Sequence, residues 1–161
     1  MTISKRLSRS DRGANLVEFA LIAPFLLLLL FGIVEFAWIF ATNIDVKQGA
    51  REGARLTAVA ESTDTNLVLG AEICSRMGLA GDDATITWVA DPTDYGDTST
   101  LEVGDGVVVT VSVPFSTLTG FIDWAFPSSL TSLDSSVEIR IEQDPSGWSD
   151  GTYDCASGDF S

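Results

Sequence analysis

Two glutamates, Glu18 and Glu35, lie within or at the edges of a long run of apolar residues near the N-terminus. An ionised carboxylate in apolar surroundings is costly unless it finds a partner or reaches water. Each of the two residues therefore needs a chemical explanation. For Glu35 the sequence leaves two alternatives open. Its side chain either lies protonated or stretched toward water in the outer half of a bilayer, or contacts another subunit laterally.

The other side chains that could do chemistry are few. Histidine is absent, and Cys74 and Cys155 are the two cysteines. A histidine-based catalytic triad, a histidine-ligated zinc site and a Cys-rich cluster therefore cannot be built. We predict no catalytic residue, no metal site and no cofactor. The cysteines are 81 positions apart and suit a disulfide in an oxidising compartment, with two unpaired thiols as the alternative.

The apolar run predicts a transmembrane helix over Ala14–Thr42. Phe19–Val34 contains sixteen residues without a charge. A hydrocarbon core of about 30 Å requires about 20 helical residues, whereas the apolar region of a secretory signal has only about 7–15. The length therefore favours a retained single-pass span over a cleaved signal. Phe25–Phe31 consists of large apolar residues, which disfavours a soluble core helix because that helix needs a polar stripe facing water.

Charge divides the chain into a basic leader and an acidic remainder. Residues 1–13 carry four basic side chains and one acidic one, whereas the chain from Asn43 onward carries five basic and 20 acidic ones. The acidic balance argues against nucleic acid as a partner. Four basic residues precede the span and three follow it closely, so these charges orient the helix weakly. The acidic domain with its two cysteines favours a cytoplasmic N-terminus and an extracytoplasmic C-terminal domain at the cell (inner) membrane.

The residues around Glu18 resemble a type IV prepilin processing site. Gly13 is followed by four residues, then Glu18, then the aromatic Phe19. In that family a membrane peptidase cuts after the glycine, and the glutamate neutralises the new terminal ammonium group of a neighbouring subunit. The resemblance implies cleavage between Gly13 and Ala14 and makes Glu18 an assembly residue. The alternative is that Glu18 simply lies at the cytoplasmic interface.

A wider segment, about residues 12–60, resembles the N-terminal region of TadE-like proteins, the minor pseudopilins of tight-adherence (Flp-type) pilus systems. The matching pieces are Arg12-Gly13, Val17-Glu18-Phe19-Ala20, Pro24, the leucine run, Phe31-Gly32, Glu35-Phe36 and the block from Ala50 to Arg55. The resemblance implies a non-enzymatic role in assembling a pilus or related secretion machinery. Its implied partners are the membrane, a prepilin peptidase, other pilins or pseudopilins and pilus assembly proteins.

Beyond the membrane, the helical pattern continues through residues 43–61 as a stalk. This part contains a stripe of small residues at helical spacing: Gly49, Ala50, Gly53, Ala54 and Ala58. Such a stripe allows another helix or a sheet to approach closely. We predict that the stripe is a subunit-packing surface and that the outer part of the helix packs on the domain that follows.

Residues 62–145 predict a small extracytoplasmic α+β domain, and residues 146–161 a Gly/Ser/Asp-rich tail. A helix capped at Asp64 or Thr65 is expected to run to about Met77. Alternating apolar residues predict antiparallel strands over Ala84–Val89, Gly106–Phe115 and Ser136–Glu142. The fold class is therefore α+β and pilin-like, with a long N-terminal helix on a small antiparallel sheet.

Two further segments contain residue types that occur at binding sites. Asp91, Asp94 and Asp97 recur every three residues, which differs from the alternating ligands of a calcium loop, so we predict a plain surface loop. The apolar residues of Phe121–Phe126 either cover the sheet or form an exposed interaction patch. An exposed patch would suit the alternative function, a membrane-tethered extracytoplasmic binding module unrelated to pili.

Overall fold

The computed structural model describes residues 10–61, 63–90, 102–115, 117–120, 132–143, 147 and 149–161, with backbone only for residues 10–12. The leader before residue 10, the loop containing Asp91, Asp94 and Asp97, and the segment Phe121–Phe126 lie outside the described residues. The element order is one long helix, one short helix, a 3-10 turn and four strands.

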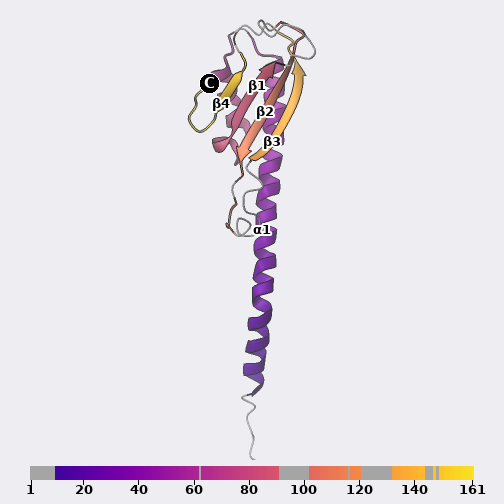
Figure 1. Ribbon diagram of the computed structural model, residues 1–161, viewed down its shortest axis with the longest axis vertical. Coiled ribbons are helices and arrows are strands. Elements are labelled where there is room, and N and C mark those ends of the chain that lie inside the picture. Colours follow the sequence, from indigo (N-terminus) through magenta and orange to yellow (C-terminus); the bar gives the residue numbers. More distant parts are fainter. Residues whose placement is uncertain are drawn as a thin grey trace, which may run out of the picture.

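Helix α1, Ser10–Ala58, is the longest element of the molecule and rises about 70 Å at 1.5 Å per residue. It is continuous through Pro24, Gly49 and Gly53, as the sequence predicts for the stalk. Its N-terminal half extends beyond the rest of the fold, whereas its C-terminal half lies against the sheet (Figure 1). The helix ends at Ala58, earlier than predicted, where the N–H of Glu142 donates to the Ala58 carbonyl at 2.9 Å.

Helix α2, Asn66–Arg76, follows with Thr65 at its N-cap and Met77 at its C-cap. These bounds agree with the predicted second helix. A 3-10 turn, η1, Gly81–Asp83, then leads into the sheet.

The sheet is antiparallel and has the strand order β3-β2-β1-β4. Its strands are β1 Thr85–Ala90, β2 Gly106–Pro114, β3 Ser132–Arg140 and β4 Gly151–Asp154. The register places Val109 of β2 opposite Trp88 on one side and Val137 on the other. The α+β class with a long helix packed on an antiparallel sheet is therefore confirmed.

Two parts of the sheet differ from the prediction. Strand β3 begins at Ser132, because β2 offers a full-length partner whose last residue, Pro114, pairs with Ser132. Strand β4 lies in the segment predicted to be a Gly/Ser/Asp-rich tail. The chain end pairs with it in turn, since Thr152 and Ser161 exchange both backbone hydrogen bonds at 2.8 and 2.9 Å. The tail is therefore part of the domain.

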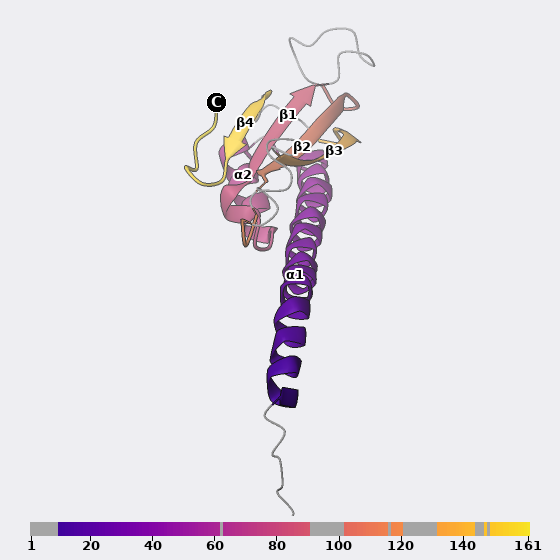
Figure 2. The same cartoon turned by 60° about the horizontal axis from the view of Figure 1, so that its bottom comes forward.

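The hydrophobic core lies between the two helices and one face of the sheet (Figure 2). Trp88 is fully buried, and its indole Nε1 donates to the hydroxyl of Thr57 on α1 at 2.9 Å. On α2, Gly70 faces the ring of Tyr153 on β4 so closely that a Cβ at residue 70 would lie 2.3 Å from the ring Cγ. These contacts fix both helices on the same face of the sheet.

Candidate functional site

The N-terminal half of α1 exposes its apolar side chains all around. From Leu16 to Val34 the large hydrophobic residues are exposed, from 41% at Val34 to 71% at Phe25. This stretch rises about 27 Å, close to the roughly 30 Å of a bilayer's hydrocarbon core. Within the described residues, α1 is the one helix long and apolar enough to cross a membrane. The helix is therefore consistent with a single membrane span.

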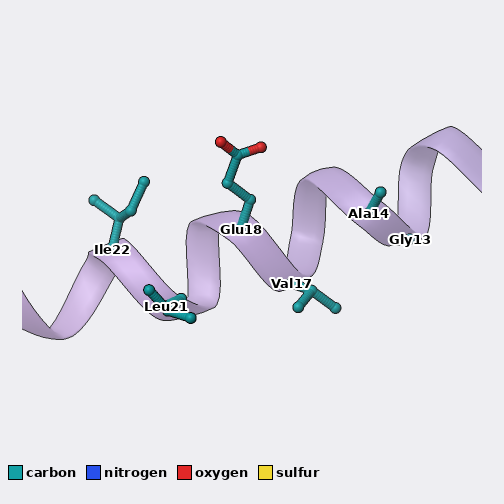
Figure 3. Close-up of a pocket in the computed structure, with 6 residues that line it drawn as sticks. All are labelled: Gly13, Ala14, Val17, Glu18, Leu21 and Ile22. Carbon is teal, nitrogen blue, oxygen red and sulfur yellow. The ribbon is translucent and has the colours of Figure 1, made fainter.

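Glu18 lies on this apolar surface without a partner. It shares a shallow surface of the helix with Gly13, Ala14, Val17, Leu21 and Ile22. Figure 3 shows its carboxylate pointing away from the helix, on the same side as Ala14 and Ile22. Within the described part of the chain, Glu18 makes no hydrogen bond or ion pair. Its carboxylate is thus open to a group supplied from outside the protomer.

Glu35 has the opposite environment, although it lies on the same helix. It is completely buried. Its Oε1 accepts the N–H of Leu118 at 2.8 Å, and its Oε2 accepts the N–H of Thr119 at 3.1 Å and the Thr119 hydroxyl at 2.7 Å. An ionised carboxylate has no proton to donate, so it can only accept hydrogen bonds. All three contacts to Glu35 come from donor groups.

The sequence-based alternatives for Glu35 were solvation near the membrane surface and contact with another subunit. The structure instead gives this residue a partner within its own chain. No local signal could have predicted it, because Leu118 and Thr119 are 83 and 84 positions away and have no motif around them.

The small-residue stripe of α1 is used inside the protomer. Four of its members are buried, namely Gly49, Ala50, Gly53 and Ala54. A Cβ at residue 53 would lie 3.2 Å from Cδ1 of Ile73 on α2 and 3.3 Å from Cγ1 of Val109 on β2. Within the protomer, the close approach that these residues allow serves α2 and the sheet. Ala58, at the end of the helix, is partly buried.

A disulfide joins Cys74 at the end of α2 to Cys155 just after β4. The Sγ atoms are 2.00 Å apart and the Cα atoms 5.9 Å apart. The same region is held by the Cys155 N–H, which donates to the Ala84 carbonyl at 2.9 Å. Asn66 and Ser149 also exchange two hydrogen bonds of 2.9 and 3.0 Å. The C-terminal segment is therefore fixed to both ends of α2.

A group of charged side chains lies where α1 meets α2. Glu52 forms an ion pair with Arg55 at 2.7 Å and a second with Arg76, which also pairs with Glu72 at 2.7 Å. The hydrogen bond from Arg55, aided by Arg76, lowers the pKa of Glu52 from 4.5 to about 2, against a smaller opposing effect of burial. The hydrogen bond to Glu52 raises the pKa of Arg55, and the hydrogen bond to Glu72, aided by Glu52, raises the pKa of Arg76. Arg55, Glu72 and Arg76 are exposed and Glu52 is partly exposed, so water screens these pairs and each contributes little to stability.

Within the described residues, His, Cys, Asp and Glu side chains form no cluster that could hold a metal ion. The fold and the exposed apolar helix define a pilin-like α+β protein with one helix of membrane-spanning length. Residues 13–55, which lie within α1, match the model of the TadE-like protein family. Its members are not known as enzymes. No match was found among curated proteins or solved structures.

Proposed function

We propose that this chain is a membrane-anchored pseudopilin that takes part in the assembly of a tight-adherence (Flp-type) pilus or related secretion machinery. The observation that carries the proposal is the contrast between the two glutamates of α1. Glu35 is buried and accepts three hydrogen bonds within the chain, whereas Glu18 is exposed on an apolar helix without a partner in the described residues.

An unpaired carboxylate at a membrane face gains most from a cation at the same depth, because the attraction between charges is stronger in a low dielectric. Cleavage after Gly13 would supply such a cation, since the new ammonium group would form at Ala14. Ala14 and Glu18 point to the same side of the helix, one turn apart (Figure 3). An axial offset of one turn, about 6 Å, would bring the ammonium group of one subunit level with Glu18 of its neighbour and fix the register between the two helices.

The surroundings of Gly13 suit a processing site. A Cβ at residue 13 would meet nothing within 4 Å, so none of the other described residues covers this position. Glycine also weakens the helix locally, by about 1 kcal/mol relative to alanine, which helps the first turn open for a peptidase. A membrane-embedded prepilin peptidase is the partner that we propose for this step.

The topology that we propose places the basic leader in the cytoplasm and the sheet domain outside the cell (inner) membrane. The disulfide between Cys74 and Cys155 supports an extracytoplasmic location for the domain, because structural disulfides persist in oxidising compartments. Other pilins or pseudopilins are the proposed partners of the α1 surface around Glu18.

The N-terminus of the membrane-extracted protein tests this proposal. We expect the mature chain to begin at Ala14 in cells with an active prepilin peptidase and at Met1 in cells without it. Gly13→Leu should block cleavage. Gly32→Leu is the matched control, because Gly32 is on the same helix and a Cβ there also meets nothing within 4 Å. An intact Met1 terminus beside an active peptidase would contradict the proposal and favour the tethered binding module.

The role of Glu18 is tested separately from cleavage. Glu18→Gln should still be cleaved and inserted, because Glu18 supports no contact within the described fold. The variant should lose cross-linking to pilin or pseudopilin partners through α1. Wild-type levels of cross-linking by Glu18→Gln would contradict the charge pairing.

A further inference from the structure

Leu118 and Thr119, which contact Glu35, lie in a short strap, Thr117–Gly120, in the connection between β2 and β3. The strap lies well away from the core of the domain along α1. Val46 is the first residue of α1 in the hydrophobic core, and Glu35 precedes it by about 16 Å of helix at 1.5 Å per residue. The strap therefore reaches from the sheet toward the apolar half of α1.

The Glu35 carboxylate accepts three hydrogen bonds from the strap. Irregular backbone is excluded from lipid because its N–H groups have no partner there. Here the N–H groups of Leu118 and Thr119, together with the Thr119 hydroxyl, donate to the Glu35 carboxylate. The carboxylate in turn is fully buried and surrounded by donors. With these hydrogen bonds formed, neither the Glu35 carboxylate nor the three donor groups needs water as a partner.

Exposed apolar side chains of α1 flank this contact on both sides. The exposed apolar surface of α1 continues on both sides of Glu35, from Leu16 to Phe40, so Glu35 lies toward the outer end of a surface long enough to span a hydrocarbon core. Trp38 follows less than one turn later and is half-buried, and tryptophan is enriched at membrane interfaces. Leu118 is 54% exposed beside this level of the helix, an unfavourable position in water and a favourable one among lipid chains.

We propose that the strap Thr117–Gly120 lies in the outer interface of the membrane, with Leu118 directed toward lipid, and that Glu35 holds it there. The partner of this surface is the lipid bilayer itself. The domain would then touch the membrane at a second point besides α1, which fixes its height and tilt above the bilayer. This inference rests on the membrane span of the proposed function and adds a lipid-contacting segment to it.

Site-directed nitroxide labelling of the full chain in phosphatidylcholine vesicles tests the inference. Leu118→Cys gives a single free thiol, because Cys74 and Cys155 are joined in a disulfide. Val34→Cys serves as the lipid reference and Ser136→Cys, which is exposed on β3, as the aqueous reference. Collisions with oxygen report lipid, and collisions with a water-soluble nickel complex report water. We expect the label at 118 to resemble the label at 34.

The reference positions separate this inference from the proposed function. A label at 34 in lipid with a label at 118 in water would overturn the inference alone. A label at 34 in water would overturn both, because the span itself would be absent.

The role of Glu35 is tested in the Leu118→Cys background. Glu35→Ala should move the label at 118 toward the nickel complex, because the strap loses the acceptor for its three donors. Phe36→Ala is the matched control, since Phe36 is the next residue of the helix and is 58% exposed. An unchanged label in Glu35→Ala would show that Glu35 does not hold the strap.

Discussion

Removal of the disulfide between Cys74 and Cys155 should strongly destabilise the sheet domain. The bond closes a loop with a sequence separation of 81 residues. For a loop of that length, the lost chain entropy of the unfolded state corresponds to about 4.5 kcal/mol at 25 °C, and removal of native disulfides typically costs about 2–5 kcal/mol. Even about 2 kcal/mol would lower the Tm of a domain of this size by about 8–16 °C.

The structure also indicates which part of the domain would loosen. Strand β4 is short and lies at an edge of the sheet. The disulfide joins Cys155, the residue after β4, to Cys74 of α2. Without the bond, the segment would depend on its short pairing with β1 and on a few hydrogen bonds such as those between Asn66 and Ser149. We therefore expect β4 to separate from the sheet before the other strands in the reduced domain.

The assay is thermal unfolding of the Cys74→Ser/Cys155→Ser variant in detergent, followed by near-UV circular dichroism. The full chain is used, and the signal reports the aromatic side chains in the folded domain. Wild-type protein treated with a reductant is the control and should unfold at the same temperature as the variant. A Tm within about 3 °C of the oxidised wild type, below the shift expected from about 1 kcal/mol, would refute the reasoning.

Three further changes test the packing and charges of the domain. Gly70→Ala should lower stability by about 1–3 kcal/mol, because the added methyl group would overlap the Tyr153 ring; an unchanged urea midpoint would contradict this packing. Thr57→Val should cost about 1–3 kcal/mol by leaving the buried Trp88 N–H unpaired, and Thr57→Ser should restore most of it; equal loss in both variants would contradict the hydrogen bond. Glu52 has a pKa lowered to about 2 by its arginine partners, so its contribution is present above pH 4.5 and is lost as pH falls toward 2. Glu52→Gln should therefore reduce the pH dependence of the free energy of unfolding between pH 4.5 and about 2. Added salt should weaken this effect, and an unchanged pH dependence in the variant would contradict the pairing.

The parts of the fold that follow local patterns could be predicted from the sequence. Hydropathy identified the apolar part of α1, and apolar spacing with Thr65 as a cap identified α2. The alternating valines of β2 likewise marked the central strand. These signals arise from neighbouring residues on one helix or strand, so they are visible without knowledge of the partner.

The remaining features depend on contacts between distant segments. Strand β4 consists of Gly151–Asp154 and has a weak pattern of its own; it forms because β1 pairs with one edge and the chain end with the other. The first residues of β3 likewise join the sheet because they pair with the last residues of β2.

The function of individual residues on α1 was harder to predict than the helix itself. Glycine and alanine at helical spacing signal a close approach, but the spacing does not identify what approaches. Here the approaching groups are Ile73 and Val109 of the same chain. For the two glutamates, sequence alone could not distinguish a residue that needs an external partner from one that already has three internal donors.

The central claim is that α1 crosses the membrane and places the sheet domain outside the cytoplasm. Its most direct test is the reaction of Ser136→Cys with a membrane-impermeant maleimide in spheroplasts with an intact cell membrane. The wild-type cysteines are bonded to each other, so wild type is the unlabelled control. We predict full labelling of Ser136→Cys before the membrane is opened. Labelling that requires permeabilisation would place the domain in the cytoplasm and contradict the account.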